Sequence, residues 1–306
     1  MKIKPLYFCL LVASSVLFAL ESPAYWQQVI PDARSVAMGG SQVAIASGAN
    51  AAYWNPASMY NTDFISLSNA SVYGFYNYYY GSVGTTLPFG TVGISGMYSG
   101  VDGVQNTAYI NGRPSLIQTT SARYILCTLT YANKLSSLMR MVASGWSSPF
   151  VDDLIFGANI KYYNNRLFDT TGTGFGFDLG LQYSLAKTLY LGAVVYNRLP
   201  INMNWSNGTS EVYPQRTRFG IGLKPIPDLL LSMDIDQDGS HAATNYYGAE
   251  YLFNPSLALR GGISPESYSV GIGLNLFNLI LDMSYSTPIE ANSLDSSLRL
   301  SVGAEW

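Results

Sequence analysis

The sequence has little charge, little cysteine and no long apolar run after its first residues. Charged residues make up 11% of the 306 residues, whereas soluble domains average about 25%. Of the two cysteines, Cys9 lies in the leader described below, so Cys127 stands alone and no internal disulfide framework is expected. No run of 18 apolar residues follows the leader, which excludes a chain that spans a membrane with helices.

The sequence also has few residues that could carry catalysis or bind a metal ion. The simplest interpretation of its one histidine, His241, is a solvated loop residue, although a histidine beside a carboxylate or serine could serve a hydrolase. Asp234 to Gly239 matches the first half of an EF-hand calcium loop, but Asn245 stands where that loop needs a bidentate glutamate. We therefore predict no enzyme activity, no cofactor and no metal site. The net charge of −3 gives no sign of a nucleic-acid partner.

Residues 1–24 have the pattern of a secretory leader, in which Lys2 and Lys4 precede an apolar core from Leu6 to Leu20. The whole chain contains 24 tyrosines and 29 glycines. An exported chain that is rich in tyrosine and glycine, poor in charge and without apolar helices is typical of a transmembrane β-barrel. A secreted all-β sandwich is the alternative.

After residue 63, apolar and polar residues alternate in short stretches, as expected for strands with one side in lipid and the other in a lumen. In the last stretch, Leu298, Leu300 and Val302 alternate with Arg299 and Ser301. These stretches predict an all-β, antiparallel barrel of about 14 strands, an even number as in bacterial single-chain barrels. The candidate strands are residues 64–72, 74–86, 90–101, 122–133, 154–163, 173–185, 188–197, 216–223, 228–238, 244–252, 256–264, 267–275, 278–286 and 297–306.

An even number of strands places both chain ends on one side of the membrane, which would be the periplasm. The periplasmic connections should then be short and the outer ones longer. The short connections are residues 88–89, 186–187, 225–227, 254–255 and 275–278, and the predicted outer loops are residues 102–121, 164–172, 197–215 and 287–296.

One connection, Lys134 to Asp153, falls on the periplasmic side but is long. Its Leu135, Leu138, Met139 and Val142 follow helical spacing. The segment could be an interfacial helix or a docking surface for a partner protein. Alternatively, it hides a further hairpin and lies outside.

The stretch from Ala33 to Met59 consists almost entirely of small residues, with a Gly39-Gly40 pair and an Asn55-Pro56-Ala57 turn. It is too rich in glycine and serine for a regular helix and too irregular for a strand. Because small residues let a backbone pack tightly inside another structure, we predict a plug in the barrel lumen. An ordinary loop leading into the barrel is the alternative. The chain would then divide into the leader, 1–24, and a barrel domain, 25–306, with the plug at 25–62 and the wall at 63–306.

The order of Arg34 to Gly40, Ala44, Ala49 to Ala51 and Trp54 to Ala57 resembles the N-terminal motif of the FadL-type outer-membrane transporters. Its spacing is most similar to the smaller branch that includes PorV- and PorQ-like proteins. Beyond this segment the resemblance is one of architecture and of the chain end.

The resemblance implies an outer-membrane channel for hydrophobic small molecules such as fatty acids. It implies that an apolar ligand binds at the outer mouth, that the plug shifts, and that the ligand leaves sideways into the bilayer through a gap in the wall. Gly39, Gly40, Asn55, Pro56 and Ala57 match the motif and would belong to the plug and the ligand path. The smaller branch implies the alternative function of a secretion-system component that holds protein cargo at the cell surface. A plain porin for polar solutes is disfavoured by the plug.

Six charged residues fall on positions that should face the lumen. An arginine on the lipid side would cost roughly 2–4 kcal/mol near the bilayer midplane, which forces such residues inward. They could hold the plug, line a path, or pair with one another across the lumen. These residues are Asp178, Arg218, Asp234, Arg260, Asp282 and Arg299.

The chain ends on an aromatic residue, Trp306, at the end of an alternating stretch. A terminal aromatic residue at this place is what barrel-assembly machinery recognises in many outer-membrane proteins, so we interpret Trp306 as an assembly signal. Tyr76, Tyr78, Tyr79 and Tyr80 are predicted to form part of an aromatic girdle in contact with outer-membrane lipid.

Overall fold

The computed structural model describes residues 31–72, 76–110, 112–142, 149–239, 242–289 and 296–306. The leader at residues 1–24 and His241 lie outside the described residues, as does the start of the segment predicted as a plug. Within the described ranges, no helix combines the length and the apolar content needed to cross a membrane.

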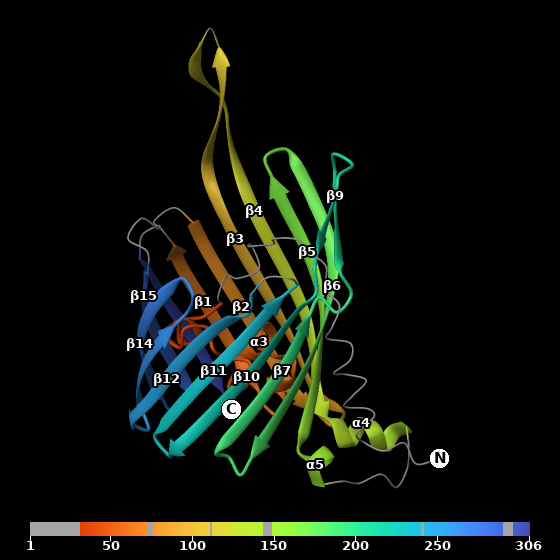
Figure 1. The fold of residues 1–306 in the computed structure, drawn as a ribbon, viewed down its shortest axis with the longest axis vertical. Coiled ribbons are helices and arrows are strands. Elements are labelled where there is room, and N and C mark those ends of the chain that lie inside the picture. The colour runs from red at the N-terminus through yellow and green to blue at the C-terminus, as the bar shows by residue number, and fades with distance from the viewer. Residues whose placement is uncertain (1–30, 73–75, 111, 143–148, 240–241, 290–295) are drawn as a thin grey trace.

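Fourteen strands form a closed antiparallel ring, which confirms the predicted fold and strand number (Figure 1). Wall strands that follow one another along the chain are paired, β7 pairs with β10, and β16 pairs with β1 to close the ring. The wall strands are β1 (Phe64–Val72), β2 (Tyr76–Leu87), β3 (Gly90–Ile110), β4 (Arg113–Lys134), β5 (Leu154–Leu167), β6 (Thr170–Leu185), β7 (Leu189–Tyr196), β10 (Arg216–Ile226), β11 (Leu229–Asp238), β12 (Thr244–Asn254), β13 (Leu257–Ile263), β14 (Ser267–Leu276), β15 (Leu279–Pro288) and β16 (Ser297–Glu305).

The two sides of the wall differ in polarity, as the alternation predicted. Leu67, Phe175 and Leu300 point outward with 62%, 69% and 54% of their surface exposed. Their inward neighbours, such as Ser68 and Arg299, are buried. A continuous exposed apolar belt of this kind is stable against lipid rather than water.

At one end of the barrel, here called the short-turn end, most strands are joined by short turns at the places where short connections were predicted. At the opposite end, β3 and β4 run far beyond the wall as a two-stranded ribbon (Figure 1). The prediction of a loop over residues 102–121 was therefore wrong. Because both faces of this ribbon are exposed, its sequence carries no alternation to reveal the strands.

The predicted outer loop at residues 197–215 is also wrong, because it contains a hairpin of β8 (Ile201–Trp205) and β9 (Ser210–Tyr213). The hairpin pairs with β6 through Thr173 and Gly172. Likewise, most of residues 164–172 extends β5 and β6, which leaves only a short turn.

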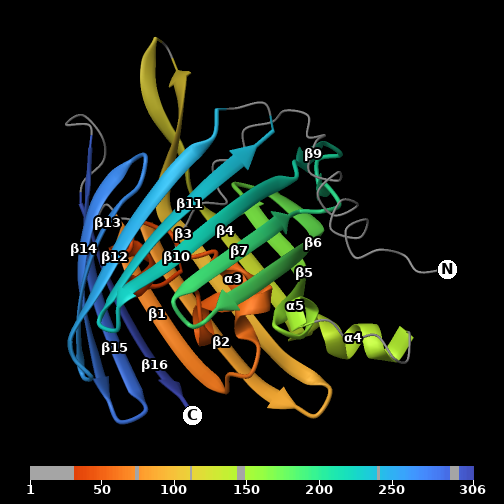
Figure 2. The ribbon, with the colours of Figure 1, turned by 60° about the horizontal axis from the view of Figure 1, so that its bottom comes forward.

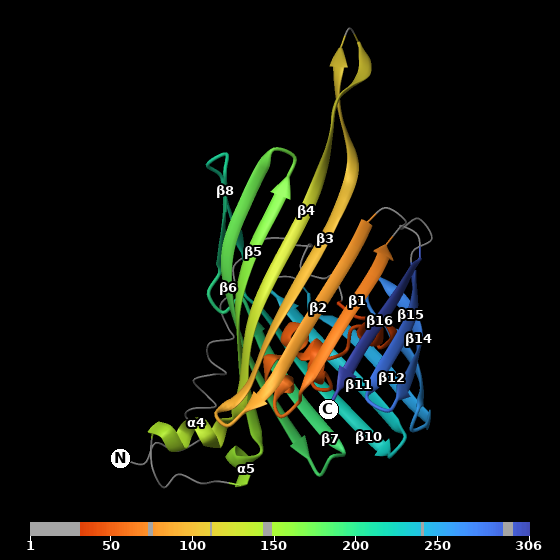
Figure 3. The ribbon, with the colours of Figure 1, turned by 180° about the vertical axis from the view of Figure 1, so that it is seen from behind.

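The long connection between β4 and β5 contains the helix that the spacing predicted. Helix α4 spans Leu135–Val142, and a short helix α5 spans Pro149–Asp152. Both lie at the end of the barrel that carries the short turns (Figures 1 and 3). The alternative of a missed hairpin on the opposite side is therefore wrong.

The N-terminal segment, defined as residues 32–59, folds into short helical turns within the ring of strands (Figure 2). The turns are α2 (Ala33–Ala37), η2 (Gly48–Asn50), α3 (Ala51–Trp54) and η3 (Pro56–Met59). None of these turns is a long regular helix, and side-chain caps begin two of them, α2 and η3.

The first cap is Asp32, whose carboxylate accepts a hydrogen bond of 2.8 Å from the backbone N–H of Ser35. The chain then turns away from α2 through Gly39 and Gly40, with φ of 62° and 77°, a region that favours glycine. That this segment blocks the lumen as a plug stays a prediction.

Candidate functional site

The N-terminal segment packs against glycines on the inner side of the wall. A Cβ atom built at Gly262 would collide with Gly39, one at Gly192 with Val43, and one at Gly157 with the backbone of Pro56 and Ala57. Further glycines of this kind are Gly93, Gly180, Gly220, Gly222, Gly248 and Gly271. The wall is therefore rich in inward glycine because the backbone of another segment approaches it closely.

Asp234 and Arg218 fasten the middle of the segment to the wall. The Asp234 carboxylate accepts hydrogen bonds from the backbone N–H groups of Gln42 at 2.8 Å and Val43 at 3.0 Å. Arg218, paired with Asp234 at 3.1 Å, donates to the carbonyl of Gly40 at 2.5 Å. Two adjacent wall residues thus satisfy both donors and acceptors of a buried turn.

The side chain of Asn55 links the middle of the N-terminal segment, strand β6 and the start of η3. Its side-chain amide donates to the carbonyls of Val43 at 2.8 Å and Leu181 at 2.9 Å, while its oxygen accepts from the N–H of Ala57 at 3.1 Å. Pro56 begins η3, where its missing N–H costs nothing. All five motif residues are therefore buried contacts between the N-terminal segment and the wall or within the segment.

Most of the predicted lumen charges form ion pairs, and all six face inward as the alternation requires. Arg260 pairs with Asp282 at 2.6 Å and with Glu250 at 2.6 Å, and Glu250 also pairs with Arg34 of the N-terminal segment at 3.0 Å. The lumen charges here pair between nearby strands of the wall and also hold the segment, because Glu250 pairs with a wall arginine and with a segment arginine.

Another lumen charge, Asp178, pairs with a residue that the sequence interpretation did not single out. Asp178 pairs with Lys161 at 2.6 Å and also accepts from Asn159, whose amide holds the carbonyl of Ala52. The carboxylates of the calcium-like stretch lie in β11, where Asp236 pairs with Arg216 at 3.3 Å. Within the described residues, no cluster of three potential metal ligands occurs.

A polar cavity of about 270 Å³ lies beside the charge network, between the N-terminal segment and strands β12 to β16. Asp32, Glu250, Asp282 and Glu305 contribute to its lining. Burial raises the pKa of the Asp32 carboxyl above its ordinary value, although Ser35 donates two hydrogen bonds that oppose the shift.

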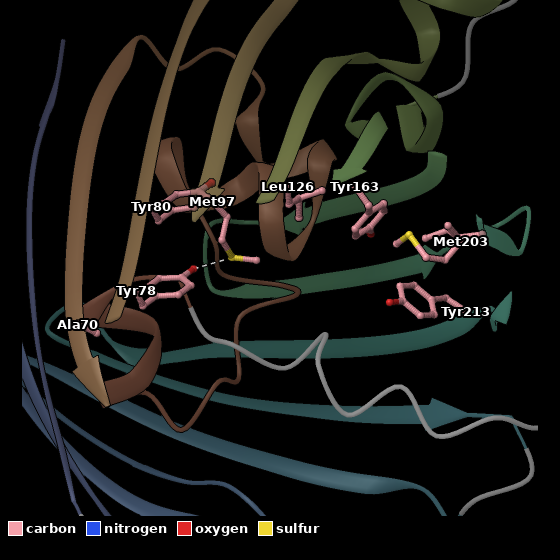
Figure 4. Close-up of a cluster of buried hydrophobic side chains, with 9 residues drawn as sticks. Ala70, Tyr78, Tyr80, Met97, Leu126, Tyr163, Met203 and Tyr213 are labelled. Carbon is pink, nitrogen blue, oxygen red and sulfur yellow. Dashed lines mark hydrogen bonds between the residues drawn. The ribbon is translucent and has the colours of Figure 1, made fainter. Parts of the chain in front are cut away.

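A second set of buried side chains, the inner apolar cluster, occupies the lumen side of the wall, where a barrel is usually polar (Figure 4). Its rings pack edge to face, as between Tyr163 and Tyr213 at 6.2 Å, and the Tyr78 hydroxyl lies 2.9 Å from the Met97 sulfur. Burial raises the pKa of Tyr213 to about 12, which keeps this phenol neutral. The cluster consists of Ala70, Tyr78, Tyr80, Met97, Leu126, Tyr163, Ile201, Met203 and Tyr213.

The inner apolar cluster corrects the predicted aromatic girdle. Tyr78 and Tyr80 are buried at the inner side of β2, and only Tyr79 points to lipid, with 50% of its surface exposed. The side chain of Tyr76 lies outside the described residues. A usable signal was present in the sequence, because strand parity from outward Val83 places Tyr79 outward and its two neighbours inward.

An apolar groove of about 920 Å³ lies on the opposite, lipid-facing side of the wall, over β1 to β4 and β14 to β16. Gly81 and Gly96 are direct partners in its lining, and Cys127 pairs with Gly96 on the next strand. Small residues in one row across β2, β3 and β4 leave the outer side of the backbone uncovered. A Cβ atom at Gly96 would indeed meet no other atom within 4 Å.

No model of a known protein family and no curated protein sequence matches this chain. Solved structures do match its fold. The P. putida toluene transporter TodX aligns with a TM-score of 0.59 and 13% identity over 90% of this chain and 97% of TodX. The monoaromatic hydrocarbon channel CymD aligns with a TM-score of 0.54 and 12% identity over 91% of this chain and 97% of CymD.

The chain has the fold of these hydrocarbon channels. At such low identity the likeness establishes the architecture and leaves the function to be argued from the chain's own residues. Nothing in these matches bears on the PorV- and PorQ-like branch.

Proposed function

We propose that the protein is a channel of the bacterial outer membrane that passes hydrophobic small molecules. The inner apolar cluster is the observation that carries this proposal, because its aromatic rings, methionines and aliphatic side chains provide a surface on which an apolar molecule can move through a barrel. Toluene, transported by TodX, and monoaromatic hydrocarbons, conducted by CymD, support the same ligand class. Fatty acids, which the sequence resemblance implies, are the alternative ligands, with a long apolar chain in place of an aromatic ring.

In this proposal the ligand moves along the inner apolar cluster toward the N-terminal segment. It begins at the hairpin β8–β9 with Met203 and Tyr213 and continues along the inner wall to Tyr80. The Tyr80 hydroxyl donates to the Ala49 carbonyl at 3.2 Å, so the cluster ends directly on the N-terminal segment. A ligand that enters at the end of the barrel that carries the hairpin β8–β9 therefore reaches the segment along apolar side chains.

The lipid-facing groove supports an exit on the same side of the barrel. Its lining shares Tyr80, Met97 and Leu126 with the inner apolar cluster, so one layer of backbone separates the two. Strands β2 and β3 pair without interruption from Asn77–Gly100 to Leu87–Gly90. A sideways exit here requires a local separation of these strands, in place of the permanent gap that the resemblance implied.

Replacing Leu126 with aspartate is expected to lower the uptake of labelled toluene by cells roughly tenfold. A carboxylate in the apolar path has to be desolvated with each passing ligand, and a loss of about 1.4 kcal/mol corresponds to this factor. Leu126→Met, which keeps the path apolar, should retain uptake at equal surface abundance. Undiminished toluene uptake by Leu126→Asp would contradict the proposal, and parallel assays with a labelled fatty acid show which apolar shape the route accepts.

Locking β2 to β3 tests the exit. In a Cys127→Ser background, Gly81→Cys with Gly96→Cys joins directly paired residues, and both positions admit a Cβ atom if the side chain of Leu67 moves slightly. We expect the oxidised protein to lose most of its uptake and to regain it on reduction. Leu231→Cys with Ala249→Cys, which joins directly paired residues of β11 and β12 outside the groove lining, is the matched control. Full uptake with the β2–β3 bond intact would place the exit elsewhere.

The alternative of a secretion-system component draws on helices α4 and α5, which add a surface at the short-turn end of the barrel. If it were correct, the Leu126→Asp variant would retain wild-type uptake of every apolar compound, and the display of a cargo protein at the cell surface would change when the α4 surface is altered.

A further inference from the structure

We propose that helix α4 lies in the membrane interface at the short-turn end of the barrel, with its apolar side in the acyl region of the phospholipids. This proposal is independent of the transported ligand. It rests on the side chains of α4, on the direction of the helix, and on the apolar residues that surround it at the same level.

One apolar stripe of α4 begins under the wall and continues into the open. Leu135 is buried at the start of the helix, while Leu138 is 41% exposed and Met139 is half-buried. These three residues share a helix face, because positions three and four apart are neighbours. Arg140 is exposed on a different face. The protein therefore covers the start of this stripe and leaves Leu138 in the next turn exposed.

The direction of α4 rules out the lumen as the place that covers this stripe. The helix runs across the strand direction and leads sideways past the wall, away from the ring of strands (Figures 1, 2 and 3). The helix contacts the ends of β4 and β5 and the short helix α5. An amphipathic helix in this position is parallel to the membrane plane, which is the arrangement of an interfacial helix.

The turns at this end of the barrel mark the level of the interface. Large apolar residues are exposed at each of several short connections, and Trp306 is 66% exposed at the chain end. Soluble loop tips do not usually carry such residues, whereas membrane proteins place them at the lipid boundary. These exposed residues are Phe89, Leu185, Ile226, Phe253 and Phe277.

The charge on α4 fits phospholipid rather than an apolar protein partner. Arg140 and Lys134, which precedes the helix, are its cations, and residues 135–140 contain no acidic side chain. In the proposed orientation Arg140 reaches the phosphate level while Leu138 enters the acyl boundary. The unusual length of this connection is then explained, because a short turn could not reach lipid beside the wall.

Fluorescence quenching tests this arrangement. In a Cys127→Ser background, single cysteines replace Leu138, Arg140, outward-facing Leu300 of β16, or Asn207 of the exposed β8–β9 turn. Each carries an environment-sensitive dye, and the protein is reconstituted into vesicles of phosphatidylcholine and phosphatidylglycerol. Brominated acyl chains quench dyes in lipid, and iodide quenches dyes in water. Leu300 and Asn207 provide the lipid and water references.

We expect bromolipid to quench the dye at position 138 nearly as strongly as at 300, and at least twofold more than at 140. Iodide should show the opposite order, with position 140 approaching 207. Equal iodide quenching at 138 and 140 without bromolipid quenching would mean that α4 projects into water. Protection of both positions from both quenchers would mean that protein covers the helix. Either result overturns the proposal.

Discussion

Removing Ala33 to Met59 is expected to turn a nearly closed barrel into an open aqueous pore. The wall carries small inward residues, many of them glycine, opposite this segment, so without the segment the space that it occupies stays open. Single-channel recordings in planar bilayers should show little conductance for the intact protein and porin-sized conductance for the deletion. Equal conductances would show that the segment does not act as a plug.

A double substitution that keeps the whole segment tests whether the segment blocks the lumen without the large change that a deletion makes to folding. Asn55→Ala with Pro56→Ala removes the amide that holds the Val43 and Leu181 carbonyls but leaves every wall residue in place. We expect intermediate conductance with frequent openings. The matched control changes another asparagine–proline pair, Asn254→Ala with Pro255→Ala, in the turn between β12 and β13, and should conduct like the wild type.

The barrel wall could be predicted from the sequence because lipid and lumen impose opposite polarity on alternating residues. In β16, Leu298 and Leu300 face lipid and Arg299 faces inward, as the alternation required. The same rule also forced the six lumen charges inward. It could not identify their partners, since Glu250 and Lys161 become partners only through the register between strands.

The sequence did not reveal the local structure of elements that have no lipid-facing side. The ribbon formed by the ends of β3 and β4 has water on both faces, so its residues show no alternation. The hairpin β8–β9 hides Ile201 and Met203 against the inner wall, which an outer loop would not do. The turns of the N-terminal segment depend on inward glycines such as Gly157 and Gly262, which are distant in sequence.

Loss of the Asp234 carboxylate is expected to release the middle of the N-terminal segment. Asp234→Leu leaves two buried N–H groups without an acceptor and removes the nearest carboxylate partner of Arg218. The side chain of Arg218 is 97% buried, and its guanidinium lies 5.0 Å from the Trp54 ring centre. Removing one member of a buried ion pair costs about 3–5 kcal/mol. We expect a lower unfolding temperature in detergent and faster proteolysis within the segment, while Asp228→Asn in an exposed turn should change neither.

The double variant Asp234→Leu with Arg218→Met identifies the origin of this cost. If most of it comes from the orphaned guanidinium, the double variant should be more stable than Asp234→Leu alone, because two apolar side chains of similar volume replace the pair. The carbonyl of Gly40 and the N–H groups of Gln42 and Val43 would still lack their partners, so part of the loss should persist. Unchanged proteolysis in Asp234→Leu would show that the remaining contacts, such as the inward glycines and the Arg34–Glu250 pair, hold the segment against the wall without Asp234.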